Sequence, residues 1–193
     1  MKKEDFTLRS LKINGGIVTV DYTEKLTLSG TVQEVEKSEK RLRTPHPDLT
    51  RAFQMLNVFV VQSTHLDALD VTRGFIEGSE QGKDAKVFLA QMIKNQQEIL
   101  DSVDIRGLHV KGSNEKRAVI ITSVVSVKGL AFSLNTPRIS LSRSTFGFEV
   151  GLDESIDEIS DEVFAYLFSG KESQQQLNFE DQEEGEGDDE TND

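Results

Sequence analysis

Side chains that catalyse reactions or bind metals are present in the chain, but not at the spacings that such sites need. The three histidines, His46, His65 and His109, lie far apart, and no two of them have the i, i+4 spacing of a zinc site. Cysteine is absent, which removes thiol nucleophiles, disulfides and thiolate metal ligands. We therefore expect no metal centre and no cofactor.

Residues 78–84 superficially resemble a phosphate-binding loop. Three residues rather than four follow Gly78 before Gly82, and Asp84 stands where a Mg²⁺-binding hydroxyl belongs. A Gly-x-Ser-x-Gly motif and a dinucleotide-type glycine fingerprint are also absent from the sequence. Carboxylate pairs such as Asp67 and Asp70 are uninformative because acids are so numerous. These observations favour a binding protein over an enzyme.

A mixture of basic and aromatic residues is typical of proteins that bind single-stranded nucleic acid, because bases stack on the rings. Phe132 lies among such basic residues in the second half of the chain, although a place in the core is the alternative for its ring. The segment 36–43 supplies a second basic cluster, for which the alternative is a solvated loop or strand end. The candidate nucleic-acid contacts are Phe132 and ten basic residues: Lys37, Lys40, Arg41, Arg43, Lys111, Lys116, Arg117, Lys128, Arg138 and Arg143.

Charge is distributed unevenly along the chain, whose formal net charge is −12. Residues 149–193 contain 17 acidic residues and a single basic one, Lys171, for a net charge of −16. Residues 1–148 contain 21 basic and 17 acidic residues, for a net charge of +4. A mildly basic body is compatible with nucleic acid as a partner, even though the sequence pI is about 4.8.

The tail, residues 171–193, has only Leu177 and Phe179 as apolar side chains, so we expect it to be disordered. Its acids would either promote solubility or compete with a nucleic-acid strand for the basic body. Within it, Gln174, Leu177 and Phe179 fit the pattern Gln-x-x-Leu-x-Phe over residues 174–179. That pattern resembles the peptides with which bacterial and phage proteins bind the replicative sliding clamp. Residues 174–179 are therefore a candidate docking peptide.

The elements that must position these residues have the pattern of an α+β fold: antiparallel β-sheet(s) with three helices and a disordered acidic C-terminal tail. Residues 1–170 are predicted to form a single α+β domain with a helical insertion at about 83–101. Alternating apolar residues predict strands at 6–13, 17–22, 26–35, 71–76, 105–110, 118–127, 130–134 and 139–141. Asn14-Gly15-Gly16 and Lys128-Gly129 are hairpin turn signals, and the apolar run 118–122 is expected at the sheet centre.

Helical periodicity predicts helices at about 47–64, 83–101 and 153–168. Leu49, Phe53, Leu56 and Val60 share one face of the first, and His46 is expected to cap it. Ser155 and Glu158 have the spacing of a capping box at the start of the last helix. Leu152, Ile156, Ile159, Val163 and Leu167 form its buried stripe, and Gly170 is its expected end.

The N-terminal residues are polar and alternating rather than apolar, and no stretch approaches the ~20 apolar residues that span a bilayer. We therefore expect a cytosolic protein with no membrane association. An oligomer is compatible with the sequence.

Residues 105–139, with the turn Leu134-Asn135-Thr136-Pro137, resemble a group of tailed-phage proteins encoded among replication and recombination genes. The helix end Tyr166-Leu167-Phe168-x-Gly170 before an acidic tail belongs to the same resemblance, whereas the insertion at 83–101 departs from it. The tail is also similar to that of bacterial single-stranded-DNA-binding proteins, but lacks their terminal Pro-Phe.

The resemblance implies a phage DNA replication or recombination accessory in the host bacterial cytoplasm. We expect it to bind single-stranded DNA through the basic β body, with the acidic tail regulating binding or docking a partner. The alternative is a protein-interaction module, either a sliding-clamp binder or an acidic DNA mimic that inhibits a host enzyme.

Overall fold

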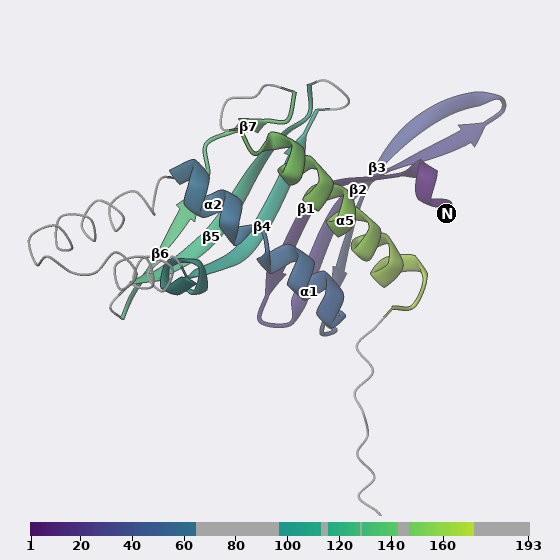
Figure 1. Cartoon of the computed structure of the whole chain (residues 1–193). Helices are drawn as coiled ribbons and strands as arrows, with labels where there is room; N and C mark the ends of the chain where they lie inside the picture. Colours follow the sequence, from purple (N-terminus) through teal and green to yellow (C-terminus); the bar gives the residue numbers. More distant parts are fainter. Residues whose placement is uncertain (65–96, 113–115, 128, 143–146, 172–193) are drawn as a thin grey trace, which may run out of the picture.

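The computed structural model describes residues 1–64, 97–112, 116–127, 129–142 and 147–171. Seven antiparallel strands form one sheet, and the helices cover one of its faces (Figure 1). The strands are β1 (Phe6–Asn14), β2 (Ile17–Leu28), β3 (Thr31–Arg41), β4 (Val103–Lys111), β5 (Ala118–Val127), β6 (Leu130–Asn135) and β7 (Ile139–Ser140). Their order is β3-β2-β1-β4-β5-β6, and β7 pairs with β5. The predicted α+β class is confirmed.

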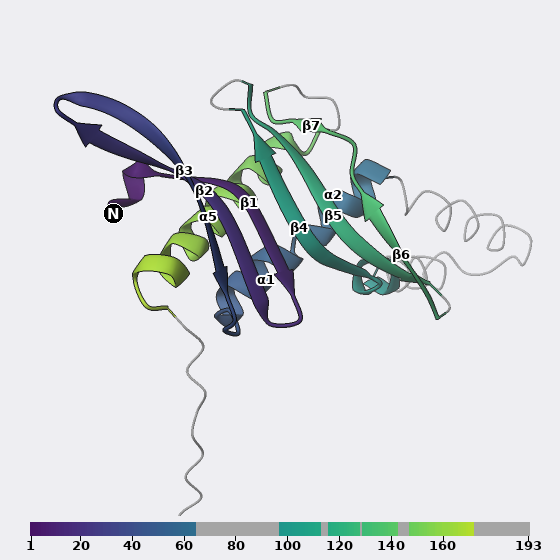
Figure 2. The ribbon, with the colours of Figure 1, turned by 180° about the vertical axis from the view of Figure 1, so that it is seen from behind.

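The covering helices are α1 (Pro47–Gln54), α2 (Asn57–Thr64) and α5 (Glu149–Phe168), and a 3-10 turn, η1 (Lys3–Asp5), precedes β1. Figure 2 shows the opposite face of the sheet, with these helices behind it. We call this surface, which none of the described helices covers, the open face. The open face is one side of the sheet, and the other side of β1, β2, β4 and β5 is buried against the helices.

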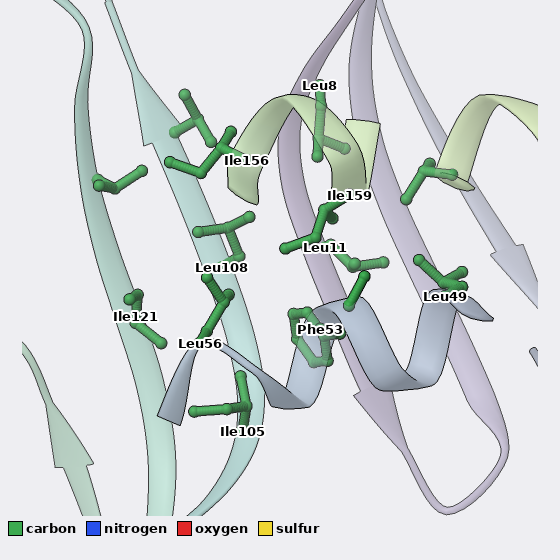
Figure 3. Packing of buried hydrophobic residues seen from close by; sticks show 14 of the residues in the cluster. Leu8, Leu11, Leu49, Phe53, Leu56, Ile105, Leu108, Ile121, Ile156 and Ile159 are labelled. Carbon is green, nitrogen blue, oxygen red and sulfur yellow. The ribbon is translucent and has the colours of Figure 1, made fainter. Parts of the chain in front are cut away.

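The core lies between the helices and β1, β2, β4 and β5 (Figure 3). Leu49, Phe53, Leu56 and Val60, predicted to share one helical face, are all fully buried. The predicted stripe of the last helix is buried as well, with Leu152, Ile156, Ile159 and Val163 at 0% exposure and Leu167 at 6%. Periodicity therefore identified both faces that the helices turn toward the sheet.

The helix predicted at 47–64 is in fact two helices separated by Met55 and Leu56. The side chains on either side of the break bond to the backbone of other elements. Gln54 donates to the Ile105 carbonyl (3.1 Å) and accepts from its N–H (3.0 Å), while Asn57 donates to the Leu100 carbonyl (3.1 Å). These tertiary bonds accompany the break, and no Gly or Pro marks it in the sequence.

The last helix begins at Glu149, four residues before the predicted start, and the predicted capping box is wrong. Ser155 lies in the helix interior, where its hydroxyl donates to the Gly151 carbonyl one turn earlier (2.8 Å). The N-cap residue is Phe148, which makes no side-chain cap bond. Gly170 has a φ of +68°, which confirms it as the end of the helix.

The third predicted strand, 26–35, was also placed wrongly. Leu26 and Leu28 belong to β2, and the chain reverses at Ser29 and Gly30, whose φ angles are +51° and +81°. Two positive φ angles in a two-residue loop are the geometry of a type I′ hairpin turn, so β3 begins only at Thr31. The β2–β3 hairpin projects beyond the rest of the sheet (Figures 1 and 2).

Residues 36–41 form the end of β3 rather than a loop, and β3 contains no buried residue. The β1–β2 and β5–β6 hairpins are confirmed by the pairs Asn14↔Ile17 and Val127↔Leu130. The run 118–122 lies in an inner strand between β4 and β6, whereas β1 and β4 occupy the middle of the sheet. Of the predicted insertion only 97–101 is described, and it is helical. The rest of the insertion and the predicted strand at 71–76 lie outside the described residues.

Candidate nucleic-acid interface

The open face carries a row of polar side chains that crosses six strands. The β-sheet register aligns Lys40 with Thr19, Thr19 with Lys12, and Lys12 with Gly107. The row continues through Thr122 to Asn135. Directly opposite residues in a sheet project from the same face, so these residues form one polar strip across the open face.

Basic residues from β1, β3 and β4 gather on or beside this strip. Lys12 and Lys40 belong to it, Arg9 comes from a bulge in β1, and Lys111 ends β4. None of these four side chains has a carboxylate at ion-pair distance within the described part of the chain. Acidic side chains are also present, since Glu36 and Asp21 lie near this cluster. The cations are therefore available for an anionic ligand on a surface of mixed charge.

Arg9 occupies the point where the sheet splits. β1 pairs with β4 only from Ser10 to Lys12, and the N-terminal half of β1 diverges from the end of β4 (Figure 2). The Arg9 guanidinium spans the opening, donating to the Thr23 hydroxyl (2.9 Å) and to the Gly112 carbonyl (3.2 Å). These bonds fix a positive charge in the opening.

Hollows lie on both sides of the split. The larger, of about 640 Å³, is lined by Arg9, Asp21, Lys37, His109 and Lys111 among others. The smaller, of about 280 Å³, lies against α5 and includes Arg9, Arg117 and Asp157. Its charged lining consists of three cations, Arg9, Lys37 and Lys111, and two acids, Asp21 and Glu36. The larger hollow therefore has mixed charge with a small excess of cations, which makes it the candidate site for an anion at the split.

Two of the predicted contact residues instead attach α5 to the sheet. Arg117 donates to Asp153 (2.8 Å) and Asp157 (2.9 Å) on that helix. Arg41 donates to the carbonyl oxygens of Leu167 (2.8 Å) and Tyr166 (3.4 Å). A cation on the last carbonyls of a helix complements the negative end of its dipole. The acidic surface of α5 is therefore partly a docking surface for the sheet.

The other predicted contacts are spread over the molecule. Lys37 forms an ion pair with Glu24, and the Arg43 carbonyl accepts the Tyr166 hydroxyl (3.0 Å). Lys116 is exposed before β5, and Arg138 is exposed between β6 and β7. Lys128 and Arg143 lie outside the described residues. The structure thus brings Lys40 and Lys111 to the open face but does not gather the full predicted set.

Phe132 does not lie on the open face. Its pairing partner is Val125, a core residue, so the ring belongs to the helix-covered side at the edge of the sheet, where it is 47% exposed. No phenylalanine or tyrosine of the described strands projects from the open face. Base stacking on Phe132 is therefore not supported at this site.

The sequence did not lead us to predict Arg9 or Lys12 as contact residues, or that His109 lines the larger hollow. The signal was available in the alternation of β1, in which Phe6, Leu8 and Leu11 are buried and the residues between them include Arg9. Lys12 resumes the polar side after the bulge between Leu8 and Ser10. The bulge itself, which aims Arg9 into the split, has no sequence signal.

The end of α5 carries a separate cluster of charged side chains. The Lys171 ammonium lies 2.7 Å from Glu162 and 2.9 Å from Asp48. Its bonds to Glu162 and then Asp48 raise the pKa of Lys171, and the bond from Lys171 is the main cause of the lowered pKa of Asp48. Lys171 is the last described residue, so the docking peptide at Gln174, Leu177 and Phe179 lies outside the described part.

His46 caps α1, as predicted, because its Nδ1 accepts the Asp48 N–H (3.2 Å). The same Nδ1 also lies 3.2 Å from an Asp48 carboxylate oxygen. Ligand-type atoms of His46, Asp48 and Glu162 lie within 4.8 Å of one another. Lys171 already supplies these carboxylates with a positive charge, and the group has a structural role.

No family model matches this chain, and no match was found among curated proteins or among solved structures. None of the described helices is both long enough and apolar enough to cross a membrane.

Proposed function

We propose that this chain is an accessory protein of phage DNA replication or recombination that binds single-stranded DNA on the open face of its sheet. The observation that carries the proposal is a set of four cations on the open face, Arg9, Lys12, Lys40 and Lys111, that have no carboxylate partner among the described residues. Arg9 and Lys111 border the split between β1 and β4, and Lys12 and Lys40 belong to the polar strip beside it. The protein binds as a folded scaffold and performs no chemistry on the strand.

The bound groups are the phosphates rather than the bases. Lys and Arg contacts to phosphate supply affinity through counterion release and carry little sequence information. With no aromatic ring on the described open face, stacking contributes little. We therefore expect weak sequence preference and strong salt dependence. The acidic tail competes for the same cations, so its removal strengthens binding.

Fluorescence anisotropy with a labelled oligonucleotide tests this proposal on the full chain and on a chain that stops after Lys171. The double variant Lys12→Gln, Lys111→Gln is expected to bind on the order of tenfold more weakly at low salt. Its plot of log affinity against log salt should be shallower by ~1.4, from ~0.7 per lost phosphate contact.

The matched control is the double variant Lys2→Gln, Arg51→Gln, which also removes two positive charges. Lys2 directly precedes η1 and Arg51 lies in α1, so both are away from the open face. The control should bind like the unaltered chain. No binding by either chain length at low salt overturns the proposal. An equal loss in the control assigns binding to net charge and overturns the open face as the site.

The second candidate function is docking of a protein, such as a sliding clamp, by Gln174, Leu177 and Phe179. Its support is that Lys171 is anchored to Asp48 and Glu162, so the peptide starts three residues beyond a fixed point. Capture of the purified clamp by the full chain, and its loss in Leu177→Ala, Phe179→Ala, tests this function. Equal capture by the variant overturns it.

A further inference from the structure

The β3 strand is an edge of the sheet, and no other described strand pairs with its outer side. It stands at one end of the strand order, with β2 as its neighbour, and runs for 11 residues. All of its side chains are exposed or half-buried. An edge of this length presents a row of backbone groups that another strand can pair with.

The register identifies which backbone groups point outward. The two-residue turn at Ser29 and Gly30 makes Leu28↔Thr31 the hydrogen-bonded closing pair of the hairpin. Hydrogen-bonded and non-bonded pairs alternate from there, so the odd-numbered residues of β3 bond to β2. The N–H and C=O groups of the even-numbered residues, including Glu34, Glu36, Ser38 and Lys40, point away from the sheet. The described residues provide no backbone partner for them outside the strand ladder.

The charges along this edge would match opposite charges on a second copy of the strand that runs antiparallel to it. Residues 36–40 read Glu, Lys, Ser, Glu, Lys. A two-fold axis at Ser38 sets Glu36 opposite Lys40 of a second copy, and Lys37 opposite Glu39 of that copy. We propose that two copies of this chain pair antiparallel through β3, with the axis at Ser38, and join their sheets edge to edge.

Neighbouring registers are excluded by like charges. In a two-fold antiparallel pair, the even-numbered residues whose backbone groups point outward must lie opposite even-numbered residues of the second copy. The two-fold axis therefore passes beside a residue and not between two residues. An axis at Glu36, Lys37, Glu39 or Lys40 sets that charge against its own copy. An axis at Val35 sets Glu34 against Glu36. Charged edge strands usually prevent edge-to-edge pairing, and among axes between Val35 and Lys40 the signs leave only the one at Ser38 open.

The side chains at this edge are suited to the pairing. Glu36 and Lys40, on the open face, have no ion pair within the described residues. Val32 is 63% exposed, and Leu42, directly after the strand, is 76% exposed. In the proposed register Leu42 of one copy lies diagonally across from Val32 of the other. One strand pair buries less than the ~1,200 Å² of a standard stable interface, so the dimer is weak and concentration-dependent.

Sedimentation equilibrium on the full chain tests the pairing by charge reversal. Glu36→Lys and Lys40→Glu each set like charges against each other twice in the dimer, and each should weaken self-association on the order of tenfold. An equimolar mixture of the two restores both opposite-charge pairs and should associate like the unaltered chain. The mixture also shows that both variants are folded.

Glu34→Lys is the matched control on the same edge. In the proposed register Glu34 lies opposite Leu42 of the second copy and only diagonally from Lys40 of that copy, so Glu34→Lys should lower the association constant much less than Glu36→Lys does. In the register centred on Lys37 it would lie directly opposite Lys40, and the constant would fall as far as in Glu36→Lys. A chain that remains monomeric at its highest soluble concentration, or single variants that associate as strongly as the unaltered chain, overturns the proposal.

A disulfide reports the register directly, since the chain contains no cysteine. Ser38→Cys places two thiols on directly opposite residues with Cα atoms about 5.5 Å apart, within disulfide range. Mild oxidation should convert this variant to a covalent dimer. Glu36→Cys, whose two copies lie four residues apart along the strands, should not be converted. Equal conversion of the two, or none of Ser38→Cys, overturns the axis at Ser38. These outcomes are independent of DNA binding.

Discussion

The two faces of the sheet use the same kind of side chain for different purposes. On the covered side, Lys3, Arg41 and Arg117 all bond to α5, through Asp161, the helix-end carbonyls, and Asp153 with Asp157. On the open side, Lys12 and Lys111 have no such partner within the described residues. A basic residue therefore contributes either to the fold or to an interface according to the face it occupies, and clustering in the sequence does not separate the two.

The largest contrast between the faces should be in stability. Phe53 is fully buried between α1 and the sheet, and Phe53→Ala should lower the free energy of unfolding by about 3–5 kcal/mol. Thr122→Ala, on the open face, should change it by less than about 0.5 kcal/mol. Urea unfolding followed by circular dichroism measures both. Similar losses in the two variants would show that the open face is covered in solution.

A smaller effect is expected when one basic residue is removed from each face and both stability and oligonucleotide binding are measured. Arg117→Gln removes both ion pairs to α5 and should lower the free energy of unfolding by about 1 kcal/mol while leaving oligonucleotide affinity unchanged. Lys12→Gln should leave stability unchanged and weaken oligonucleotide binding. Urea unfolding and anisotropy on both variants give the four values. Loss of binding in Arg117→Gln without loss of stability would return Arg117 to the interface.

The parts of the fold that the sequence predicted are those with a periodic apolar signal. The stripe from Leu152 to Leu167 and the face from Leu49 to Val60 were identified because burial selects residue type at each turn. The Asn14-Gly15-Gly16 hairpin was identified because its turn requires positive φ, and Gly15 and Gly16 have φ angles of +54° and +79°. Local chemistry decided these elements.

The parts that the sequence did not predict depend on long-range partners. β3 has no buried residue and hence no apolar alternation, so its extent was visible only through pairing with β2. Ser155 and Glu158 have capping-box spacing, but Glu149 is itself buried and extends the helix beyond them. Arg117 contacts α5 because Asp153 and Asp157, which are 36 and 40 residues away in the sequence, lie next to it in space. Contacts of this kind also determined which predicted cations reached the open face.

The smallest expected effect concerns the ion pairs of Lys171, where the covered side ends and the tail begins. The pKa of Asp48 is lowered from 3.8, so its contribution to stability is present above that value and is lost as pH falls through the lower folded pKa. The pKa of Lys171 is raised from 10.5, so its contribution is present below that value and is lost as pH rises through the higher folded pKa. Lys171→Gln should therefore lower the urea midpoint by a constant small amount at intermediate pH. The difference from the unaltered chain should shrink at both acidic and alkaline extremes.

The control for this prediction is Lys2→Gln, which removes an exposed charge paired only with Glu4 in the described structure and should show no such double-ended profile. A difference that persists unchanged at strongly acidic pH would mean that Asp48 is not the partner that matters. The screened surroundings of these side chains keep the effect small, because exposed ion pairs contribute little. Its pH profile nevertheless distinguishes a charge that anchors the last helix, as basic residues do on the covered face, from a charge that is only solvated.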